Sequence, residues 1–270
     1  MGKIMLKASN VQKDIDGNTI LQHVSFKIEE NISIAIRGSN GSGKSTLLKL
    51  LAGIYEPTSG KLIRNTNKIG YVPEHFPEGL RFKVKEYLTL VASFQGIPEK
   101  DMETELSKYI SLFGIEPFIN TPLKKCSKGT KQKVGILQAL LIKPDILLLD
   151  EPLTGLDPNS QQNLISILEK LKTSMTIIFT THEDLLVDNI ANQILYVNDG
   201  RVIVHTETKS SYRLIKVRFS NKSFLTELEL NEIHIEEDIA LIRVPIDKSD
   251  FLLKELLNRN CSVLDVRERI

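Results

Sequence analysis

The sequence predicts an α/β fold with a parallel β-sheet at its centre. Two short runs, residues 146–149 and 175–179, are almost wholly apolar, as strands buried on both faces of a parallel sheet are. A third strand is expected at residues 32–36, and a glycine-rich loop and then a helical pattern follow it. Strands that alternate with helical segments in this way favour a parallel sheet covered by helices.

The composition is that of a globular protein without a strong overall charge. The chain has 270 residues, so one large domain with a small second domain is expected. Apolar residues make up 41% and charged residues 26%, which excludes a disordered chain. Lys plus Arg number 35 and Asp plus Glu 34, a net charge of +1. No nucleic acid is therefore expected as a partner, and any phosphate site must be local.

Three features predict a soluble protein of the cytoplasm. No apolar run is long enough to cross a bilayer, and the N-terminal residues lack the apolar segment of a secretory signal. The two cysteines, Cys126 and Cys261, lie far apart and form no CxxC pair. This cysteine usage indicates a reducing compartment and argues against a disulfide framework or a zinc site.

The first elements can be assigned in order along the chain. Residues 4–36 alternate between apolar and polar side chains and are expected to form strands, with a turn at residues 16–18. After the glycine-rich loop, a leucine stripe over residues 47–51 predicts a helix that Gly53 ends. Residues 61–72 supply two further short strands.

A helical insert is expected over about residues 75–139. Within it, one helical face carries Met102, Leu106, Ile110 and Phe113, and the opposite face is rich in Glu and Lys. The buried strand at 146–149 follows, then a helical leucine and isoleucine stripe at 164–171, then the strand at 175–179. The insert thus interrupts the alternation of strand and helix in a domain expected to span residues 1–205.

The composition changes after about residue 205, which predicts a small accessory domain at residues 206–270. A strand is expected from residue 212, a hairpin over 232–244 that turns near 237–238, a helix around 251–257 and a last strand at 261–266. With one unassigned segment after the first strand, this order is compatible with a small ferredoxin-like α+β unit.

One segment fits the phosphate-binding pattern GxxxxGK[ST] completely. Glycines let successive backbone N–H groups converge on an anion, and the following helix adds the positive end of its dipole. In this pattern the lysine reaches the β- and γ-phosphates and the next hydroxyl reaches Mg²⁺. A chance glycine-rich turn is the alternative, and the position between a buried strand and an amphipathic helix argues against it. The nucleotide-binding residues expected here are Gly38, Ser39, Asn40, Gly41, Ser42, Gly43, Lys44, Ser45 and Thr46.

Two acidic residues follow the buried strand at 146–149. Asp150 is expected at the carboxyl end of that strand, beside the phosphate-binding loop, where it can hold Mg²⁺ through water. Glu151 lies one residue further and is free to polarise an attacking water. Two solvated acids after a core strand are the alternative interpretation, which the phosphate-binding loop makes less favourable.

Residues 126–134 are Cys-Ser-Lys-Gly-Thr-Lys-Gln-Lys-Val, and they narrow the class of nucleotide-binding protein that the sequence indicates. They resemble the LSGGQ motif, and the helix start after it, of ABC transporter ATP-binding subunits, and the resemblance covers roughly residues 1–205. Ser127 and Gly129 match the motif, whereas Cys126, Lys128 and Thr130 depart from it. A serine N-cap and the N–H groups after it can bind a γ-phosphate at a helix start.

The resemblance implies a P-loop ATPase fold and further site residues. Asp157 lies where the family has its D-loop, and His182 lies where the family has its switch histidine, which contacts the γ-phosphate. Members of the family bind ATP and Mg²⁺ and form a head-to-tail dimer, in which each ATP lies between Lys44 of one cassette and Ser127 of the other. The implied partners are a second nucleotide-binding domain, in a homodimer or a heterodimer, and transmembrane permease subunits. The protein would therefore sit peripherally on the cytoplasmic face of the cell membrane, with the insert as docking surface.

Two positions depart from the family pattern. Ile15 stands where an aromatic residue usually stacks on adenine, so the base contact should be apolar only. Glu74 stands where the family has a glutamine that reaches Mg²⁺ and the attacking water, and a carboxylate can also bind Mg²⁺. Glu74, the segment Ser127-Lys128-Gly129 and the C-terminal domain are similar to bacterial drug- and antibiotic-exporter subunits, which favours an exporter.

Three other functions stay open from the sequence. A soluble ABC-type ATPase of chromosome maintenance would carry long coiled coils, which the roughly eighty residues between loop and motif lack. Macromolecular assembly factors and translation factors use the same ATP-hydrolysing domain, although translation factors carry two such cassettes and this chain has one. A non-hydrolysing nucleotide-dependent scaffold is the third, and the intact set Lys44, Asp150, Glu151 and His182 argues against it.

Overall fold

The computed structural model describes residues 2–205, 212–219, 233–236 and 238–269. The chain divides into two compact units, Met1–Thr206 and Glu207–Ile270. Across the described residues, none of the helices combines the length and the apolar character needed to cross a membrane.

A six-stranded sheet forms the centre of the first unit. Its order is β5-β6-β7-β3-β8-β9, and all neighbouring pairs are parallel except β8 and β9. Strands β6 and β7 are buried along their whole length, which explains their apolar composition. The strands are β3 (Ser33–Arg37), β5 (Ile69–Val72), β6 (Ile146–Leu149), β7 (Thr176–Thr180), β8 (Gln193–Asn198) and β9 (Arg201–His205).

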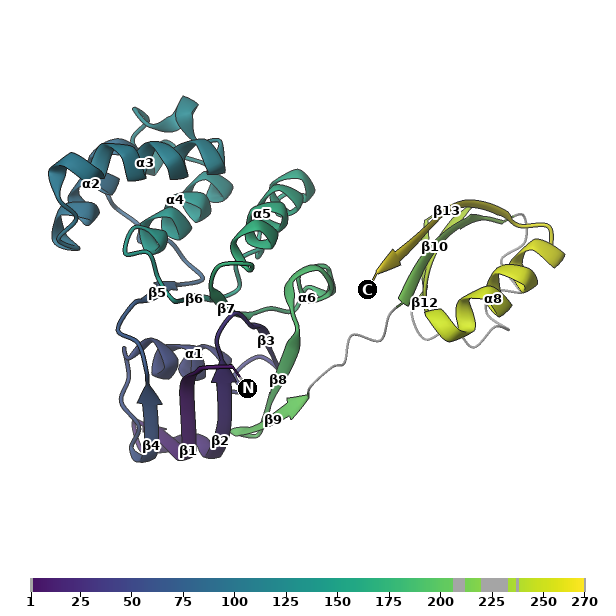
Figure 1. Cartoon of the computed structure of the whole chain (residues 1–270), viewed down its shortest axis with the longest axis horizontal. Helices are drawn as coiled ribbons and strands as arrows, with labels where there is room; N and C mark the ends of the chain where they lie inside the picture. The colour runs from purple at the N-terminus through teal and green to yellow at the C-terminus, as the bar shows by residue number, and fades with distance from the viewer. Residues whose placement is uncertain (1, 206–211, 220–232, 237, 270) are drawn as a thin grey trace. The chain divides into compact units, whose positions relative to one another are not determined.

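One face of this sheet packs against helix α1 (Lys44–Ala52), and beyond α1 lies a second, antiparallel sheet. This sheet has the order β2-β1-β4, from β1 (Ile4–Ile15), β2 (Asn18–Glu29) and β4 (Ser59–Arg64). Leucines of α1 fill the space between the two sheets because the helix is apolar on both sides. Figure 1 shows α1 between β1, β2 and β4 and the central strands.

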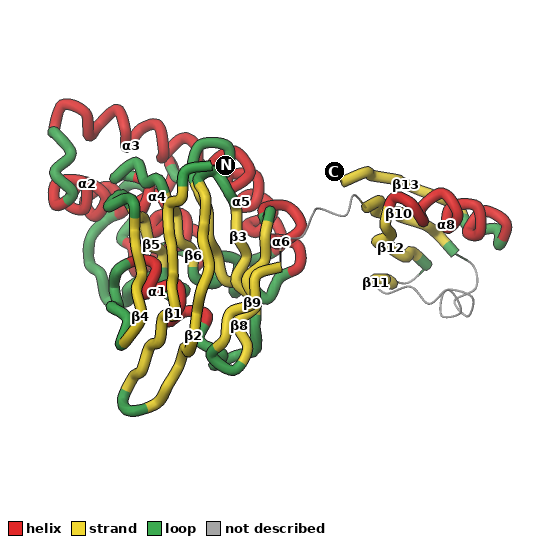
Figure 2. Tube along the Cα trace, turned by 60° about the horizontal axis from the view of Figure 1, so that its bottom comes forward, coloured by secondary structure: helices red, strands yellow, loops and turns green. Residues whose placement is uncertain are grey.

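Helices cover the other face of the central sheet, and three of them form the insert. In Figure 1 the insert helices α2, α3 and α4 gather at the end of this unit away from the antiparallel sheet, and Figure 2 shows α2 next to α3. Gly96, with φ +71°, and Pro98, the N-cap of α3, separate α2 from α3, so the helical stretch is not continuous. The helices are α2 (Val84–Phe94), α3 (Glu99–Phe113), α4 (Lys128–Leu140), α5 (Pro158–Leu171) and α6 (Asp184–Ile190), with 3₁₀ turns η1 (Glu116–Phe118) and η2 (Leu123–Lys125).

The second unit is an antiparallel sheet with a helix on one face. The sheet order is β11-β12-β10-β13, and α8 packs against β10, β12 and β13. In chain order this is strand order 2-3-1-4. The ferredoxin-like arrangement remains a proposal, because residues 220–232, between β10 and β11, lie outside the described residues. The elements are β10 (Tyr212–Arg218), β11 (Ile233–Glu236), β12 (Ile239–Pro245), α8 (Ile246–Asn258) and β13 (Ser262–Arg269).

Candidate active site

The glycine-rich loop runs from the end of β3 to the start of α1, at the carboxyl ends of the parallel strands. Gly38 has φ +151°, and a Cβ there would lie 2.2 Å from the carbonyl oxygen of Val197, so the position admits only glycine. Gly43 is the N-cap of α1 with φ +105°, and no side chain caps this helix. The first turn of α1 therefore offers its backbone N–H groups to an anion.

Lys44 is buried, and its ammonium group lies inside the curve of the loop. Nζ donates hydrogen bonds to the carbonyl oxygens of Gly38 (2.9 Å) and Ser39 (3.1 Å). Because these acceptors are neutral carbonyls, the positive charge has no anionic partner among its described hydrogen bonds. An incoming phosphate would supply that partner, since charge-assisted bonds are about twice as strong as neutral ones.

Asp150 stands at the end of β6, buried beside the loop. Its Oδ1 accepts hydrogen bonds from Ser45 Oγ (3.1 Å) and from Thr180 Oγ1 (2.7 Å). The buried phenol of Tyr71, on β5, lies near this carboxylate: burial and the negative charge of Asp150 both raise the pKa of Tyr71. Asp150 and Ser45 thus form an oxygen-lined corner at the start of α1.

Glu151 follows with a backbone φ of +44°, which is uncommon for a residue with a side chain. Thr180 fixes this turn, because the Glu151 N–H donates to Thr180 Oγ1 at 2.8 Å. Oε1 of Glu151 lies 3.3 Å from Nε2 of His182, and Thr154 Oγ1 lies 3.4 Å from Oε2. Burial raises the pKa of Glu151, although the charges of His182 and Lys44 oppose the effect. A carboxylate and an imidazole therefore meet beside the loop.

The residues around Asp150 fit Mg²⁺ bound together with a nucleotide. Ser45 and Asp150 present two hard oxygen ligands, the donor type that Mg²⁺ prefers. Among the described residues, no group of three or more His, Cys, Asp or Glu side chains could hold a metal ion. At nucleotide sites Mg²⁺ is usually held by one or two protein ligands, and phosphate and water oxygens complete its coordination.

Ser127, Gly129 and Asp157 lie at two helix starts. Ser127 is the N-cap of α4, and its Oγ accepts the Thr130 N–H at 3.1 Å. Asp157 is the N-cap of α5 and takes two hydrogen bonds from Ser160, which lower its pKa. A Cβ on Gly129 would lie 3.3 Å from Ser160 Oγ, so the two helix starts are close. None of the described hydrogen bonds joins these residues to the phosphate-binding loop.

The two departures from the family pattern, Ile15 and Glu74, make no described hydrogen bond to the network around Asp150. Ile15 ends β1, half-buried, opposite Asn18 across the turn. Glu74 lines a hollow of about 320 Å³ with Lys128, Lys131 and Gln132 of α4, and its Oε1 lies 3.7 Å from Nδ1 of His75. No described hydrogen bond connects Glu74 to Asp150 or Ser45.

Thr180 is a residue of this site to which the sequence analysis gives no role. It is fully buried and holds both Asp150 and Glu151. The available signal was a hydroxyl directly after the apolar residues 177–179 of β7. Arg37, which ends β3 and forms a 2.7 Å ion pair with Asp184 just after His182, was missed as well.

A phosphate-binding loop, a buried aspartate and a neighbouring glutamate on a parallel sheet define a P-loop nucleoside triphosphatase. The ABC transporter family matches residues 21–154. The lantibiotic transport ATP-binding protein SrtF of Streptococcus pyogenes is 33% identical over 81% of this chain and 97% of its own. The chain belongs to the ABC transporter ATP-binding family and is an ATP-binding ATPase subunit.

Solved structures of cassettes agree with this assignment. CbiO1 of Clostridium perfringens, part of the ABC transporter complex cbiONQ, is 28% identical and has a TM-score of 0.66, over 74% of this chain and 87% of its own. A dimeric, post-hydrolysis cassette, MJ0796 bound to ADP and Pi, is 25% identical with a TM-score of 0.67, over 75% and 98%. The fold is thus that of an ABC ATPase.

Proposed function

We propose that this chain hydrolyses ATP to drive a transmembrane transporter, through closure of two cassettes around ATP. The single observation that carries the proposal is the network in which Ser45, Asp150, Thr180, Glu151 and His182 meet beside the phosphate-binding loop. In this assignment Gly38 to Thr46 hold the phosphates. The dimeric state of the similar cassette MJ0796 supports closure between two copies.

Each residue of the network has one task in this assignment. Ser45 and Asp150 hold Mg²⁺, which neutralises charge on the phosphates when bound. Glu151 orients the attacking water and takes its proton, because the buried carboxylate is a stronger base than an exposed one. His182, half-exposed at 3.3 Å from Glu151, contacts the γ-phosphate. Lys44 turns from the loop carbonyls to the β- and γ-phosphates.

The helix starts serve the opposite cassette in this proposal. Ser127 and Gly129 lack any described hydrogen bond to the loop of their own chain, and Asp157 lies beside them at the start of α5. A site in trans explains this separation, since the N–H groups at the start of α4 would meet the γ-phosphate bound to the partner copy. Ile15 supplies an apolar contact to adenine. Glu74 supplies a second carboxylate close to the motif at the start of α4.

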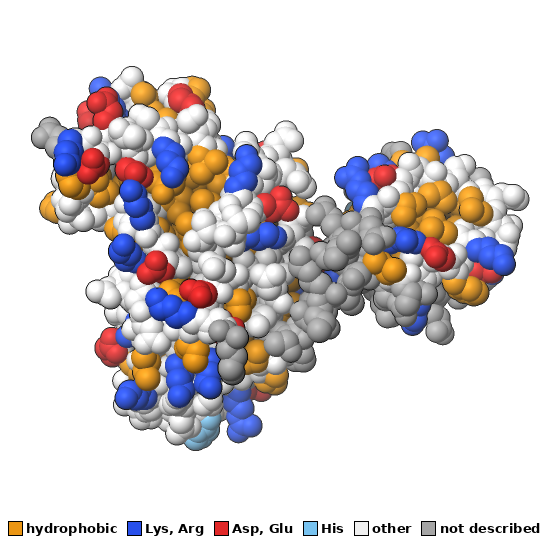
Figure 3. All heavy atoms as spheres, viewed as in Figure 1, with side chains coloured by type: hydrophobic (Ala, Val, Ile, Leu, Met, Phe, Trp, Pro, Cys, Tyr) orange, Lys and Arg blue, Asp and Glu red, His pale blue; other side chains and the backbone are white. Residues whose placement is uncertain are grey.

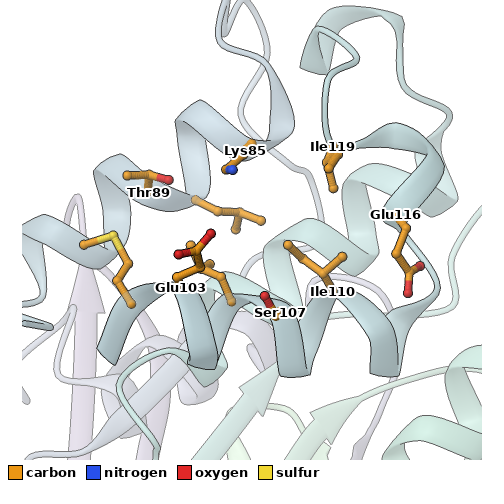
Figure 4. A pocket seen from close by; sticks show the side chains of 10 residues that line it. Lys85, Thr89, Glu103, Ser107, Ile110, Glu116 and Ile119 are labelled. Carbon is orange, nitrogen blue, oxygen red and sulfur yellow. The ribbon is translucent and has the colours of Figure 1, made fainter. Parts of the chain in front are cut away.

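The insert offers a groove for the transmembrane partner. Between α2 and α3 lies a cavity of about 440 Å³ with an apolar floor of Leu88, Leu106 and Ile110. Figure 4 shows Thr89 of α2 and Ser107 of α3 on facing sides of it, and Figure 3 shows hydrophobic side chains gathered over the insert. A cytoplasmic segment of a permease with an apolar face fits this groove. The relative cbiO1 belongs to a multi-subunit transporter complex.

The direction of transport is proposed to be export, at the cytoplasmic face of the cell membrane. The Ser127-Lys128-Gly129 form of the motif, which is similar to that of exporter subunits, supports this direction.

Two variants test the proposal. Glu151→Gln should bind ATP, stop turnover and accumulate a dimer, because the amide keeps the shape but accepts no proton. If this variant stays monomeric with ATP and hydrolyses it at the full rate, Glu151 does not have this role.

The docking groove is tested by Ser107→Trp, which fills it. The matched control is Thr104→Trp, because Thr104 is also exposed on α3 but does not line the groove. Only Ser107→Trp should abolish stimulation of ATP hydrolysis by the membrane subunit, with basal hydrolysis kept; equal stimulation in both variants would exclude this docking site.

A further inference from the structure

Strand β13 lies at the edge of the sheet of the second unit. It pairs with β10 along one side, and Figure 2 shows it at the side of the sheet opposite to β11. Within the described ranges, no strand pairs with its other side. An edge strand of eight residues presents a row of backbone N–H and C=O groups to which another strand can add.

The edge also leaves apolar side chains exposed. Leu264 is 42% and Val266 40% exposed. Val266 lies opposite the fully buried Ile215 of β10, so it shares the face of the sheet that α8 covers, at the margin of the core. A strand added along β13 would remove this surface from water, which is favourable for association.

Two opposite charges flank Val266 on the other face of the sheet. Asp265 and Arg267 lie two residues apart and form an ion pair of 2.6 Å, with side chains 41% and 70% exposed. Edges that are protected against pairing commonly carry charges that repel an added strand. On this edge Asp265 and Arg267 provide a pair of opposite charges at the spacing that an antiparallel neighbour can match.

The charges select one register for pairing with a second copy. Antiparallel strands related by a twofold axis through a residue place the residues on either side of it opposite their counterparts. An axis at Asp265 would oppose two carboxylates, and an axis at Arg267 would oppose two guanidinium groups. An axis at Val266 opposes Asp265 to Arg267 twice and sets the two Val266 side chains together. Only this last register satisfies the rule that opposite charges stabilise and like charges destabilise directly opposed pairs.

We propose that β13 pairs with β13 of a second copy of this chain, antiparallel about Val266, so that one sheet runs through both copies. This contact needs no nucleotide and therefore goes beyond the ATP-dependent closure proposed above. It keeps two ATP-binding units in one assembly before ATP binds, which raises the effective concentration of each for the other.

The test uses the full chain without nucleotide and with Mg²⁺ chelated, and measures the dimer dissociation constant by sedimentation equilibrium. Asp265→Arg and Arg267→Asp each place like charges opposite one another, so each should weaken the dimer about tenfold or more. The double variant exchanges the two charges and restores opposite pairs, so it should return to within about threefold of the wild type. Lys254→Asp, an exposed charge reversal on α8, is the control and should dimerise as the wild type does.

A wild-type chain that stays monomeric without nucleotide would overturn this proposal. A double variant as weak as the single ones would overturn it too, because the loss would then not come from the charge pairing. The ATP-dependent dimer of Glu151→Gln is measured separately with ATP present. Absence of the nucleotide-free dimer can therefore be distinguished from absence of the ATP-dependent dimer.

Discussion

Replacing Thr180 by Val tests whether one buried hydroxyl positions both acidic residues. Val has nearly the shape of Thr but can neither donate to Asp150 Oδ1 nor accept the Glu151 N–H. A hydrogen bond to a charged group contributes about 1.5–3 kcal/mol, and an unpaired buried N–H costs about 1–3 kcal/mol. The variant should therefore lose about 2.5–6 kcal/mol of stability, which lowers Tm by roughly 5–24 °C in a domain of this size.

Turnover should fall as well, and by an amount that follows from the same bond. If the 1.5–3 kcal/mol that fixes Asp150 is lost in the transition state, kcat falls about 10- to 150-fold. KM for ATP should hardly change, because the loop and Lys44 do not contact Thr180 in any described hydrogen bond. The assay is steady-state ATP hydrolysis well below the Tm of each variant.

Two control variants separate positioning from stability. Thr180→Ser keeps the hydroxyl and loses a methyl group, so it should lower Tm and keep kcat within about threefold. Thr176→Val, at the opposite end of β7, removes the acceptor of the Asn31 N–H (2.9 Å) and should lower Tm alone. The reasoning would be refuted by a folded Thr180→Val chain with wild-type kcat, or by a Thr176→Val chain with an equal loss of kcat.

The remaining predictions concern single site residues. Lys44→Ala should abolish ATP binding in titration calorimetry, since the charge-assisted phosphate contact is lost, and normal hydrolysis would contradict the assignment. Because burial raises the pKa of Glu151, its contribution to stability is fully present at acid pH and is lost as pH rises through the folded-state pKa. Glu151→Gln should therefore have the higher Tm at neutral pH, with a difference that shrinks on acidification; a constant difference would count against the raised pKa. Ile15→Tyr should strengthen ATP over GTP by about 0.5–1.5 kcal/mol in competition binding, and no change would place the base elsewhere. Glu74→Gln should keep ATP binding and shift the Mg²⁺ concentration for half-maximal hydrolysis, and an unchanged value would leave Glu74 without a role at the metal.

The sequence predicted the parts of the fold whose signal is local. Strands β6 and β7 are apolar because both faces are buried, and Gly53 ends α1 as a left-handed C-cap. Helix α6 was not assigned, because seven residues give too short a stripe for a period to emerge. Strands β8 and β9 were also unassigned, although both have an apolar run, residues 194–197 in β8 and residues 202–204 in β9.

In the site, too, residues contiguous in sequence could be predicted, whereas contacts between distant residues could not. The loop is one contiguous segment and the acidic pair, Asp150 and Glu151, is another, so the spacing of residues within each segment predicted its chemistry. Thr180 lies 30 residues from Asp150, and its role arises only because parallel strands β6 and β7 end at the same edge. The sequence gives no indication of that contact, since a threonine at the end of a buried strand is common for many reasons.

The network also explains how two neighbouring acids can take different tasks. Thr180 donates to Asp150 and accepts from the Glu151 N–H, so one hydroxyl holds the aspartate against α1 while the chain turns sharply after it. The turn, with φ +44° at Glu151, places this second side chain beside His182. Asp150 therefore keeps its hydrogen-bond donors, Ser45 and Thr180, on one oxygen. Glu151, with a raised pKa and an imidazole beside it, is left as the group that can take a proton.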